Sequence, residues 1–412
     1  MANVSSSNGL EKRPKLRFPG FDEPWEHKEL LYYLVENTDR NKQLKFGKEN
    51  VLSVSGEYGI VNQIAFQGRS FAGESVADYH VVETDDIVYT KSPLKANPYG
   101  IIKVNNGVPG IVSTLYAVYH PLKTVVPRFV DFYFSNDLRL NKFLKPLVNI
   151  GAKHDMKVNN TFVLTGMVVF PPLREQQKIV DFLTILDRRI DVQRKKVEAL
   201  KKYKRGLLSR EFGQQENGDL NNRYVGKLKD YFHLSSGTTP SSTNRAFYSG
   251  NIRWVSSGEL KPKYLCETSQ HISSEAVSSC NLREYPANTL LVAMYGLEAA
   301  GVRGTASILS VPATISQACM AIQQTGEIDI EYLYYWYIYN GQWIGIRIAQ
   351  GTKQQNLSTD TLGNLRIHAP SCSKQKKVCK LLSQIDYLIE KESQKIDLLS
   401  SAKRGLLQQL FI

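Results

Sequence analysis

The stretch IVDFLTILDRRIDVQRKKVEALKKYKRGLL, residues 179–208, has a second copy, VCKLLSQIDYLIEKESQKIDLLSSAKRGLL, at residues 378–407. The copies align when the chain is shifted by 199 residues, and both end in Lys-Arg-Gly-Leu-Leu. In each copy apolar residues recur at alternating spacings of four and three. An apolar repeat of about 3.5 residues, sustained over four heptads, is typical of a coiled-coil seam. We therefore expect two long helices that pack through these stripes.

Each predicted seam has nine positions, and seven of them are apolar in both copies. The breaks fall at equivalent places, Gln193 and Lys204 in the first copy and Glu392 and Lys403 in the second. Matched breaks argue against the alternative of two unrelated amphipathic core helices. The apolar seam residues are Ile179, Leu183, Leu186, Ile190, Val197, Leu200 and Leu207 in the first copy, and Val378, Leu382, Ile385, Ile389, Ile396, Leu399 and Leu406 in the second.

The direction of pairing follows from the polar breaks in the seam. A parallel pair would set Lys204 level with Lys403, which places like charges side by side. An antiparallel pair brings Lys204 near Leu382, where its aliphatic stem lies on apolar surface and its ammonium reaches water. We expect an antiparallel pair within one chain. Pairing of two chains through the same seam is the alternative.

Composition bounds the class of protein. The chain has 412 residues, 42% apolar and 22% charged, which suits two to four folded domains. No apolar run approaches the ~18 residues of a membrane helix, and residues 1–10 lack the apolar core of a signal peptide. The five cysteines contain no CxxC pair, so we expect reduced thiols and a cytoplasmic location. Zinc on Cys266, His271 and Cys280 would need a spacing that matches no usual finger.

Positive charge is concentrated on the two predicted helices. Residues 172–212 hold twelve Lys/Arg against six Asp/Glu, and residues 371–412 hold eight against four, within a formal net charge of +13. A basic balance favours a polyanionic partner. An acidic protein partner fits the charge equally well, and a solvated helix surface remains the plainest interpretation.

The repeat extends beyond the helices, because Leu30 aligns with Leu228 and Tyr33 with Tyr231. We predict an α+β fold with a pseudo-twofold repeat, in which two mixed globular domains are separated by two long helices that form an antiparallel coiled coil. The predicted parts are a flexible tail (1–15), a first globular domain (16–170), a helix (171–212), a linker (213–223), a second globular domain (224–369) and a second helix (370–412). Within the first domain we expect strands at 87–89, 110–119 and 162–169.

Catalytic motifs are few. The sequence has no GxGxxG and no Walker lysine loop. Residues 97–100, Asn-Pro-Tyr-Gly, resemble the Asn-Pro-Pro-aromatic tetrad of amino-methyltransferases, but they lack the second proline and a preceding glycine-rich loop. Asp85 and Asp86 precede a strand and are better explained as a solvated turn than as a metal site. The chain is therefore interpreted as a non-enzyme with no catalytic residue and no metal.

Both domains offer polar, basic and aromatic loops. Arg, Lys, Asn and Gln are the side chains that read base edges, and Ser and Thr bind phosphates. The candidate DNA-binding residues are Arg69, Ser70, Lys91, Lys153 and His154 in the first domain, and Thr238, Thr239, Arg245, Arg253, Tyr295, Arg303, Lys353, Gln354, Gln355 and Asn356 in the second. For any one loop, an ordinary surface role is the competing interpretation.

This organisation resembles the specificity subunit of type I restriction-modification systems, over about residues 16–412. The resemblance rests on residues 16–21 (LRFPGF), 170–179 (FPPLREQQKI), 236–240 (SGTTP) and 351–358 (GTKQQNLS), with the two Lys-Arg-Gly-Leu-Leu ends. The second helix entry, residues 369–372 (APSC), departs from the Pro-Pro-Leu pattern. The first domain also lacks the Gly-Thr-Thr-Pro loop.

The resemblance implies a role in DNA recognition. Each globular domain would be a target recognition domain that reads one half of a bipartite double-stranded DNA site, and the coiled coil would set the spacing. The chain would dock two modification (methyltransferase) subunits, and restriction (helicase-nuclease) subunits would complete the enzyme. It would bind no cofactor itself, since S-adenosylmethionine, ATP and Mg2+ belong on the partner subunits, and it would have no membrane partner. The alternative function is a non-catalytic coiled-coil scaffold that links two protein- or RNA-binding domains.

Overall fold

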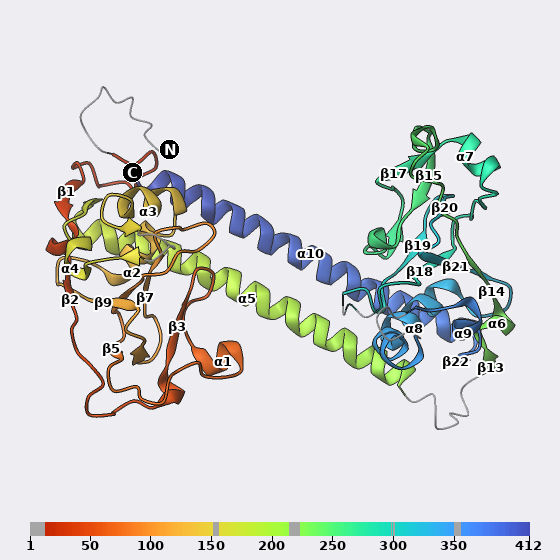
Figure 1. Ribbon diagram of the computed structural model, residues 1–412, viewed down its shortest axis with the longest axis horizontal. Helices are drawn as coiled ribbons and strands as arrows, with labels where there is room; N and C mark the ends of the chain where they lie inside the picture. Colours follow the sequence, from red (N-terminus) through yellow and green to blue (C-terminus); the bar gives the residue numbers. More distant parts are fainter. Residues whose placement is uncertain (1–12, 151–155, 214–222, 298, 300, 350–355) are drawn as a thin grey trace. The chain divides into compact units, whose positions relative to one another are not determined.

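The computed structural model describes residues 13–150, 156–213, 223–297, 299, 301–349 and 356–412 (Figure 1). The chain divides into two compact units. The first comprises residues 1–194 with 394–412, and the second comprises residues 195–393. The two long helices, α5 (Leu173–Phe212) and α10 (Cys372–Leu410), each contribute one part to the first unit and the other part to the second.

The first unit is built on an antiparallel four-stranded sheet of order β2-β9-β6-β7. These strands are Leu34–Glu36 (β2), Tyr116–Pro121 (β9), Ile87–Thr90 (β6) and Ile102–Val104 (β7). Every residue of β6 is buried, as expected for a central strand. The other strands are β1 (Glu26–Glu29), β3 (Leu52–Ser55), β4 (Gly59–Asn62), β5 (His80–Val82), β8 (Gly110–Val112), β10 (Asn149–Ile150), β11 (Met156–Lys157) and β12 (Met167–Phe170), and the short helices are η1 (Leu30–Tyr32), η2 (Lys48–Asn50), α1 (Gln63–Gln67), α2 (Pro127–Tyr133), α3 (Asp137–Leu144) and α4 (Asn160–Val163).

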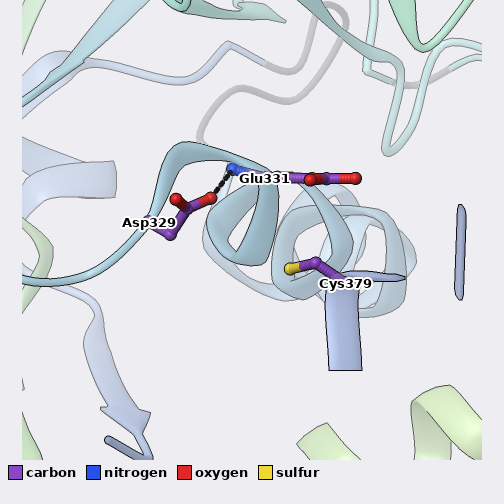
Figure 2. A group of neighbouring side chains, drawn as sticks. All are labelled: Asp329, Glu331 and Cys379. Atoms are coloured by element: carbon purple, nitrogen blue, oxygen red, sulfur yellow. Dashed lines mark hydrogen bonds between the residues drawn. The ribbon is translucent and has the colours of Figure 1, made fainter. Parts of the chain in front are cut away.

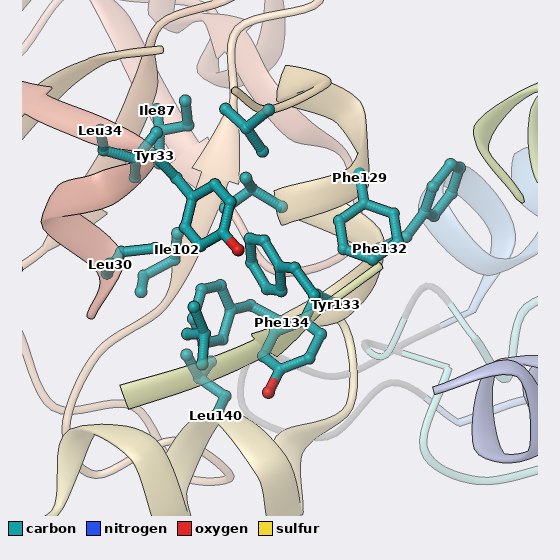
Figure 3. Packing of buried hydrophobic residues seen from close by; sticks show 14 of the residues in the cluster. Leu30, Tyr33, Leu34, Ile87, Ile102, Phe129, Phe132, Tyr133, Phe134 and Leu140 are labelled. Atoms are coloured by element: carbon teal, nitrogen blue, oxygen red, sulfur yellow. The ribbon is translucent and has the colours of Figure 1, made fainter. Parts of the chain in front are cut away.

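A group of aromatic side chains packs together in the core of the first unit (Figure 3). Helix α2 begins with Pro127 at its first position, where a backbone N–H would have no partner within the helix, so its absence in proline loses no hydrogen bond. The helix then turns Phe129 and Tyr133 toward Phe170, at ring-centroid distances of 5.0 and 4.8 Å. Phe411, at the end of α10, lies 5.3 Å from Phe129. The edge-to-face and tilted geometries of these rings stabilise the packing beyond the area that they bury.

Two predicted strands of this unit are interrupted. Residues 162–169 were predicted as one strand, but α4 occupies Asn160–Val163 and only Met167–Phe170 is extended. The Asn159 side chain accepts hydrogen bonds from the backbone of Thr161 and Phe162, which starts a helical turn. Residues 110–119 form β8 and then β9, because a turn at Ser113 closes with a bond from the Tyr116 backbone N–H to the Ser113 carbonyl.

The second unit contains a five-stranded sheet of order β14-β21-β18-β19-β16 and a three-stranded sheet of order β17-β15-β20. The strands of the larger sheet are Phe232–Ser236 (β14), Cys319–Gln324 (β21), Leu290–Ala293 (β18), Ala306–Leu309 (β19) and Tyr264–Leu265 (β16). The other strands are β13 (Tyr224–Lys227), β15 (Ile252–Val255), β17 (Gln270–Ile272), β20 (Thr314–Ile315) and β22 (Arg366–Ala369), and the helices are α6 (Leu228–Tyr231), η4 (Arg245–Tyr248), η5 (Ser257–Glu259), α7 (Ser274–Ser279), α8 (Ile330–Trp343), the π-helix η6 (Ile344–Ile348) and α9 (Thr359–Gly363).

The two units share one topology despite their different sequences. The order β2-β9-β6-β7 in the first corresponds to β14-β21-β18-β19 in the second. Each unit also pairs its first strand with the strand that precedes its outgoing long helix, β1 with β12 and β13 with β22. The fold is therefore a duplicated α+β arrangement in which each copy of the repeat ends in a long helix.

In both units the two long helices pack antiparallel. The apolar core of the first unit joins Ile179 and Leu183 of α5 to Leu407 and Leu410 of α10. That of the second unit joins Leu208 and Phe212 of α5 to Cys379 and Leu382 of α10. The start of one helix therefore contacts the end of the other in each unit, which is the expected antiparallel pairing. All fourteen apolar seam residues named above are buried or half-buried.

The two lysines that interrupt the seam each pair with a carboxylate. Lys204 lies 2.5 Å from Asp386 in the second unit, and Lys403 contacts Asp187 in the first. We expected the lysine heads to reach water. Instead each ammonium pairs with an aspartate of the other long helix. Asp187 and Asp386 are equivalent positions of the repeat, as Lys204 and Lys403 are, so the same ion pair is formed twice. In the part of the chain that the structure describes, no helix combines the length and apolarity needed to cross a membrane.

Candidate nucleic-acid interface

One end of the larger sheet in the second unit gathers several predicted loops. Strand β14 ends there at Ser236, β21 begins at Cys319 and β18 ends at Ala293, as the antiparallel register requires. The loop after β14 carries Thr238 and Thr239, both exposed, and the Thr239 hydroxyl accepts a hydrogen bond of 3.2 Å from the Gln317 backbone. Two loops that are distant in sequence are thereby held at the same end of the sheet.

The loop after β18 and the segment before α9 complete this sheet end. Tyr295, two residues after the strand, is 36% exposed. The Arg303 guanidinium is half-buried, and its Nε donates a 2.7 Å hydrogen bond to the Leu297 carbonyl. Exposed Asn356 joins the same place, because the backbone of Leu357 donates to the Met294 carbonyl at 2.8 Å. The structure thus brings together Thr238, Thr239, Tyr295, Arg303 and Asn356.

The equivalent end of the first sheet is centred on Lys91, which directly follows β6. Its half-buried ammonium donates to the side-chain oxygen of Asn160 at 3.3 Å. The Asn160 amide nitrogen donates to the Glu36 carboxylate at 2.8 Å, and Glu36 ends β2. Burial lowers the pKa of Lys91, and Arg40 lowers it further while Glu36 opposes the shift. A cation, an amide and a carboxylate are therefore linked in sequence by hydrogen bonds beside β6.

A buried histidine lies beside the same group of charges. His80 on β5 is 2% exposed, and its Nδ1 has no hydrogen-bond partner among the described residues. Burial lowers its pKa to about 4, with Arg40 and Lys91 acting in the same direction. The ring is therefore neutral near neutral pH, so it adds no charge to the edge that Arg40 and Lys91 make positive.

Glycine shapes the loop that follows the central strand in each unit. Gly100 has a φ of +89°, and a Cβ there would lie 1.9 Å from the Thr90 carbonyl oxygen. Gly304 has a φ of +73° at the corresponding return of the loop after β18. Positive φ is a conformation that side chains other than glycine rarely adopt. Both loops thus return tightly to the sheet.

Other predicted residues lie elsewhere or outside the described part of the chain. Exposed Arg69 stacks over the Phe71 ring at 4.6 Å, and Ser70 bonds to Gln63, in the loop after α1. Arg245 is exposed on η4, and Arg253 on β15 pairs with Glu267 at 3.5 Å, so both belong to the smaller sheet region of the second unit. Lys153, His154, Lys353, Gln354 and Gln355 lie outside the described residues.

Sequence reasoning missed Glu36, Arg40 and Asn160. Glu36 and Asn160 are 124 positions apart, and no local motif marks either of them. The pairing of β2 with β9, and of β9 with β6, sets Glu36 level with Ile87 at the start of β6, and the Asn160 side chain connects Glu36 to Lys91 beyond the end of that strand. These residues can be found only once the order of the strands in the sheet is known.

Asp329, Glu331 and Cys379 form a group whose ligand atoms lie within 4.8 Å of one another (Figure 2). Each has another role. Asp329 caps α8 by accepting a 2.7 Å hydrogen bond from the Glu331 backbone. The Glu331 carboxylate accepts from the Lys263 ammonium and from the Ser383 hydroxyl, and burial raises the pKa of the Cys379 thiol. A protonated thiol and two engaged carboxylates are explained by helix packing, without a metal.

Comparisons with known proteins follow the same division of the chain. The family described as "Type I restriction modification DNA specificity domain" matches residues 76–202 and 222–400. The type I restriction enzyme MjaIX specificity subunit of Methanocaldococcus jannaschii is 28% identical over 192 residues, which cover 46% of this chain and 43% of that protein. The EcoR124I/EcoR124II specificity subunit of Escherichia coli is 25% identical over 176 residues, 42% of each chain. Each match therefore spans less than half of the relative's length.

Solved structures agree on the fold. The S subunit of a type I restriction-modification system from M. genitalium has a TM-score of 0.60 at 13% identity, covering 97% of this chain and 99% of that one. A chain from a structure of the type I R-M system, described for its assembly and conformational transition, has a TM-score of 0.56 at 16% identity, with the same coverage. Because the family match extends over most of the sequence, this chain belongs to the type I restriction modification DNA specificity domain family.

Proposed function

We propose that this chain is the DNA specificity subunit of a type I restriction-modification enzyme. Each globular domain would act as a target recognition domain and read one half of a bipartite site in double-stranded DNA. The observation that carries the proposal is the duplicated topology with unlike side chains. The polar groups that accompany the sheet differ between the units, with Glu36, Lys91 and Asn160 in the first and Thr238, Thr239 and Tyr295 in the second. One scaffold used twice with different polar groups suits two different half-sites.

The long helices support a second part of the proposal. They would set the spacing between the half-sites and dock two modification subunits, with restriction subunits completing the enzyme. Their positive charge and the exposed apolar side chains of Ile185, Val192 and Leu398 favour a surface that is covered in an assembly. The chain itself would be non-catalytic and cytoplasmic. S-adenosylmethionine, ATP and Mg2+ would be held by the partner subunits.

Exchange of one unit tests this function. Residues 20–170 are replaced by those of another specificity subunit with similar long helices, and the hybrid is assembled with its modification subunits. We expect methylation mapping by sequencing to show a bipartite site in which one half has changed and the other is retained. A hybrid in which residues 224–369 are replaced should change the opposite half.

Two results would contradict the proposal. Methylation that changes in both halves, or in neither, would rule out modular reading. Tight binding that does not weaken with salt would favour the scaffold alternative, because neutralisation of phosphates gives a steep salt dependence. A matched comparison of duplex DNA with RNA at two salt concentrations separates an RNA-binding adaptor from a DNA reader.

A further inference from the structure

The first unit contains a polar pocket of about 760 Å³ beside Lys91. Its lining includes Glu36, Lys91, Asn149, Asn159, Asn160 and Phe162. Asn149, Asn159 and Phe162 are exposed, the Phe162 ring by 49%, so the pocket has a surface rim. Four of the six lie at element boundaries, since Glu36 ends β2, Lys91 follows β6, Asn149 begins β10 and Asn160 begins α4. Glu36, Lys91 and Asn160 are half-buried, so a ligand can reach them through this pocket.

The hydrogen-bonding groups of this pocket have a fixed order. Asn160 uses its amide nitrogen on Glu36 at 2.8 Å and its amide oxygen on Lys91 at 3.3 Å. The backbone carbonyl of Asn160 also accepts a 2.9 Å hydrogen bond from the Tyr119 hydroxyl. Asn160 thereby holds a donor, the Lys91 ammonium, on one side and an acceptor, the Glu36 carboxylate, on the other. The ammonium has three hydrogens and the carboxylate has two oxygens, so both keep capacity for a ligand.

The same place in the second unit is closed by apolar side chains. Met294 is the residue after β18, as Lys91 is the residue after β6, and its carbonyl accepts from the Leu357 backbone. Met294 and Leu357 are 7% and 1% exposed. Packing therefore does not require a polar group at this position of the fold. The cluster in the first unit is a local feature that topology alone does not explain.

We propose that Lys91 and Glu36 read a G·C base pair in the half-site of the first unit. A lysine ammonium donates to the O6 and N7 acceptors of guanine, and a carboxylate accepts from the N4 amino group of cytosine, which are the two edges that a G·C pair presents in the major groove. Asn160 is the positioning residue, since it spaces the two charges. This inference rests on the proposed function and names part of the sequence that the first unit recognises.

The test uses the chain assembled with its modification subunits. Lys91→Gln and Glu36→Gln variants are compared with the parent by methylation mapping and by methylation of duplexes that carry a single substituted base pair. The half-site of the first unit is the one that changes when residues 20–170 are exchanged. In the parent we expect a G·C pair in that half-site. In Lys91→Gln we expect the preference for G·C over A·T at that position to fall roughly 5- to 100-fold, with the other half-site unchanged.

Two further variants serve as controls. Lys91→Arg retains a donor for guanine and should keep the preference, which separates a lost contact from a damaged fold. Lys123→Gln makes the same chemical change at an exposed lysine two residues after the end of β9. It should leave methylation as in the parent. Circular dichroism and thermal melting establish that each variant is folded.

Separate outcomes overturn separate statements. A half-site of the first unit without any G·C pair, or a folded Lys91→Gln protein with undiminished preference at every position, overturns the Lys91 assignment while leaving the subunit's function intact. A uniform loss of binding at all sequences would show that Lys91 contacts phosphate only, which also overturns base reading. A parent assembly that methylates no bipartite site removes the proposed function itself.

Discussion

Gln176 and Gln375 occupy the same position in the two copies of the repeat, and both are buried. Gln176 accepts a 2.9 Å hydrogen bond from the Val126 backbone before α2 and donates to the Pro171 carbonyl. Gln375 accepts from the Asp329 backbone before α8, also at 2.9 Å, and donates to the Pro370 carbonyl. A single side chain thus ties the start of each long helix to the start of a core helix in its own unit.

Replacing either glutamine should destabilise only the unit that contains it. Gln176→Leu leaves the Val126 N–H and the Pro171 carbonyl without their buried partner, and we expect a loss of about 1–3 kcal/mol in the free energy of unfolding. Gln375→Leu should cost a similar amount in the second unit. Chemical denaturation followed by hydrogen exchange in each unit gives both values.

The neighbouring exposed positions provide the matched controls. Gln177→Leu and Lys376→Leu alter exposed residues one position further along each helix, and each should change stability by less than about 0.5 kcal/mol. Equal losses in the buried and exposed variants would show that the buried hydrogen bonds are not what these glutamines supply.

At the scale of elements, the repeat builds one ion pair twice between the long helices. Lys204 pairs with Asp386 and Lys403 pairs with Asp187, each within its own unit. All four side chains are between 18% and 27% exposed, so the pairs are neither buried in the seam nor free in water. Partial burial strengthens the attraction relative to a fully exposed pair and makes removal of one partner costly.

We expect a double-mutant cycle to detect this pairing. Lys204→Ala and Asp386→Ala should each destabilise the second unit, and the coupling energy between them should be about 1 kcal/mol. The cycle of Lys403→Ala with Asp187→Ala should give a similar value in the first unit. Arg194, which is exposed and pairs with Asp191 along α5 itself, gives the control cycle, for which about 0.3 kcal/mol is expected. Coupling no greater than in the control would mean that the seam lysines act through their aliphatic stems.

At the scale of the whole molecule, the proposed function assigns the spacing of the half-sites to α5 and α10. Insertion of seven residues after Arg194 and seven after Ser393 preserves the 3.5-residue repeat of both seams. The added helix is ~10 Å long at ~1.5 Å per residue. This length corresponds to ~3 base pairs, so methylation mapping should show unchanged half-sites separated by a longer spacer.

The extra length also rotates one half-site about the duplex, so activity should be lower than in the parent. A matched variant that carries a seven-residue insertion in α5 alone breaks the alignment of the two seams and should lose methylation. Retention of the original spacer by the double-insertion variant would show that the helices do not determine it.

The sequence by itself determined the duplication, the two long helices and their antiparallel pairing. These follow from residue spacing along one element and from matched breaks such as Lys204 and Lys403. Both can be read from the sequence alone because helical periodicity is local. It also located the central strand near residue 87. It failed at residues 162–169, where an Asn159 side chain starts a helical turn that apolar content does not reveal.

The groups at the candidate interface were decided by tertiary structure. Lys91 was found from its loop, but Glu36 and Asn160 were not, since their proximity depends on strand order across 124 residues. In the second unit the loops that carry Thr239 and Tyr295 meet because β14 and β18 end where β21 begins. A contact between residues at the ends of different strands leaves no local pattern in the sequence. Sheet topology decides it, because the register of antiparallel neighbours fixes which loops share an edge.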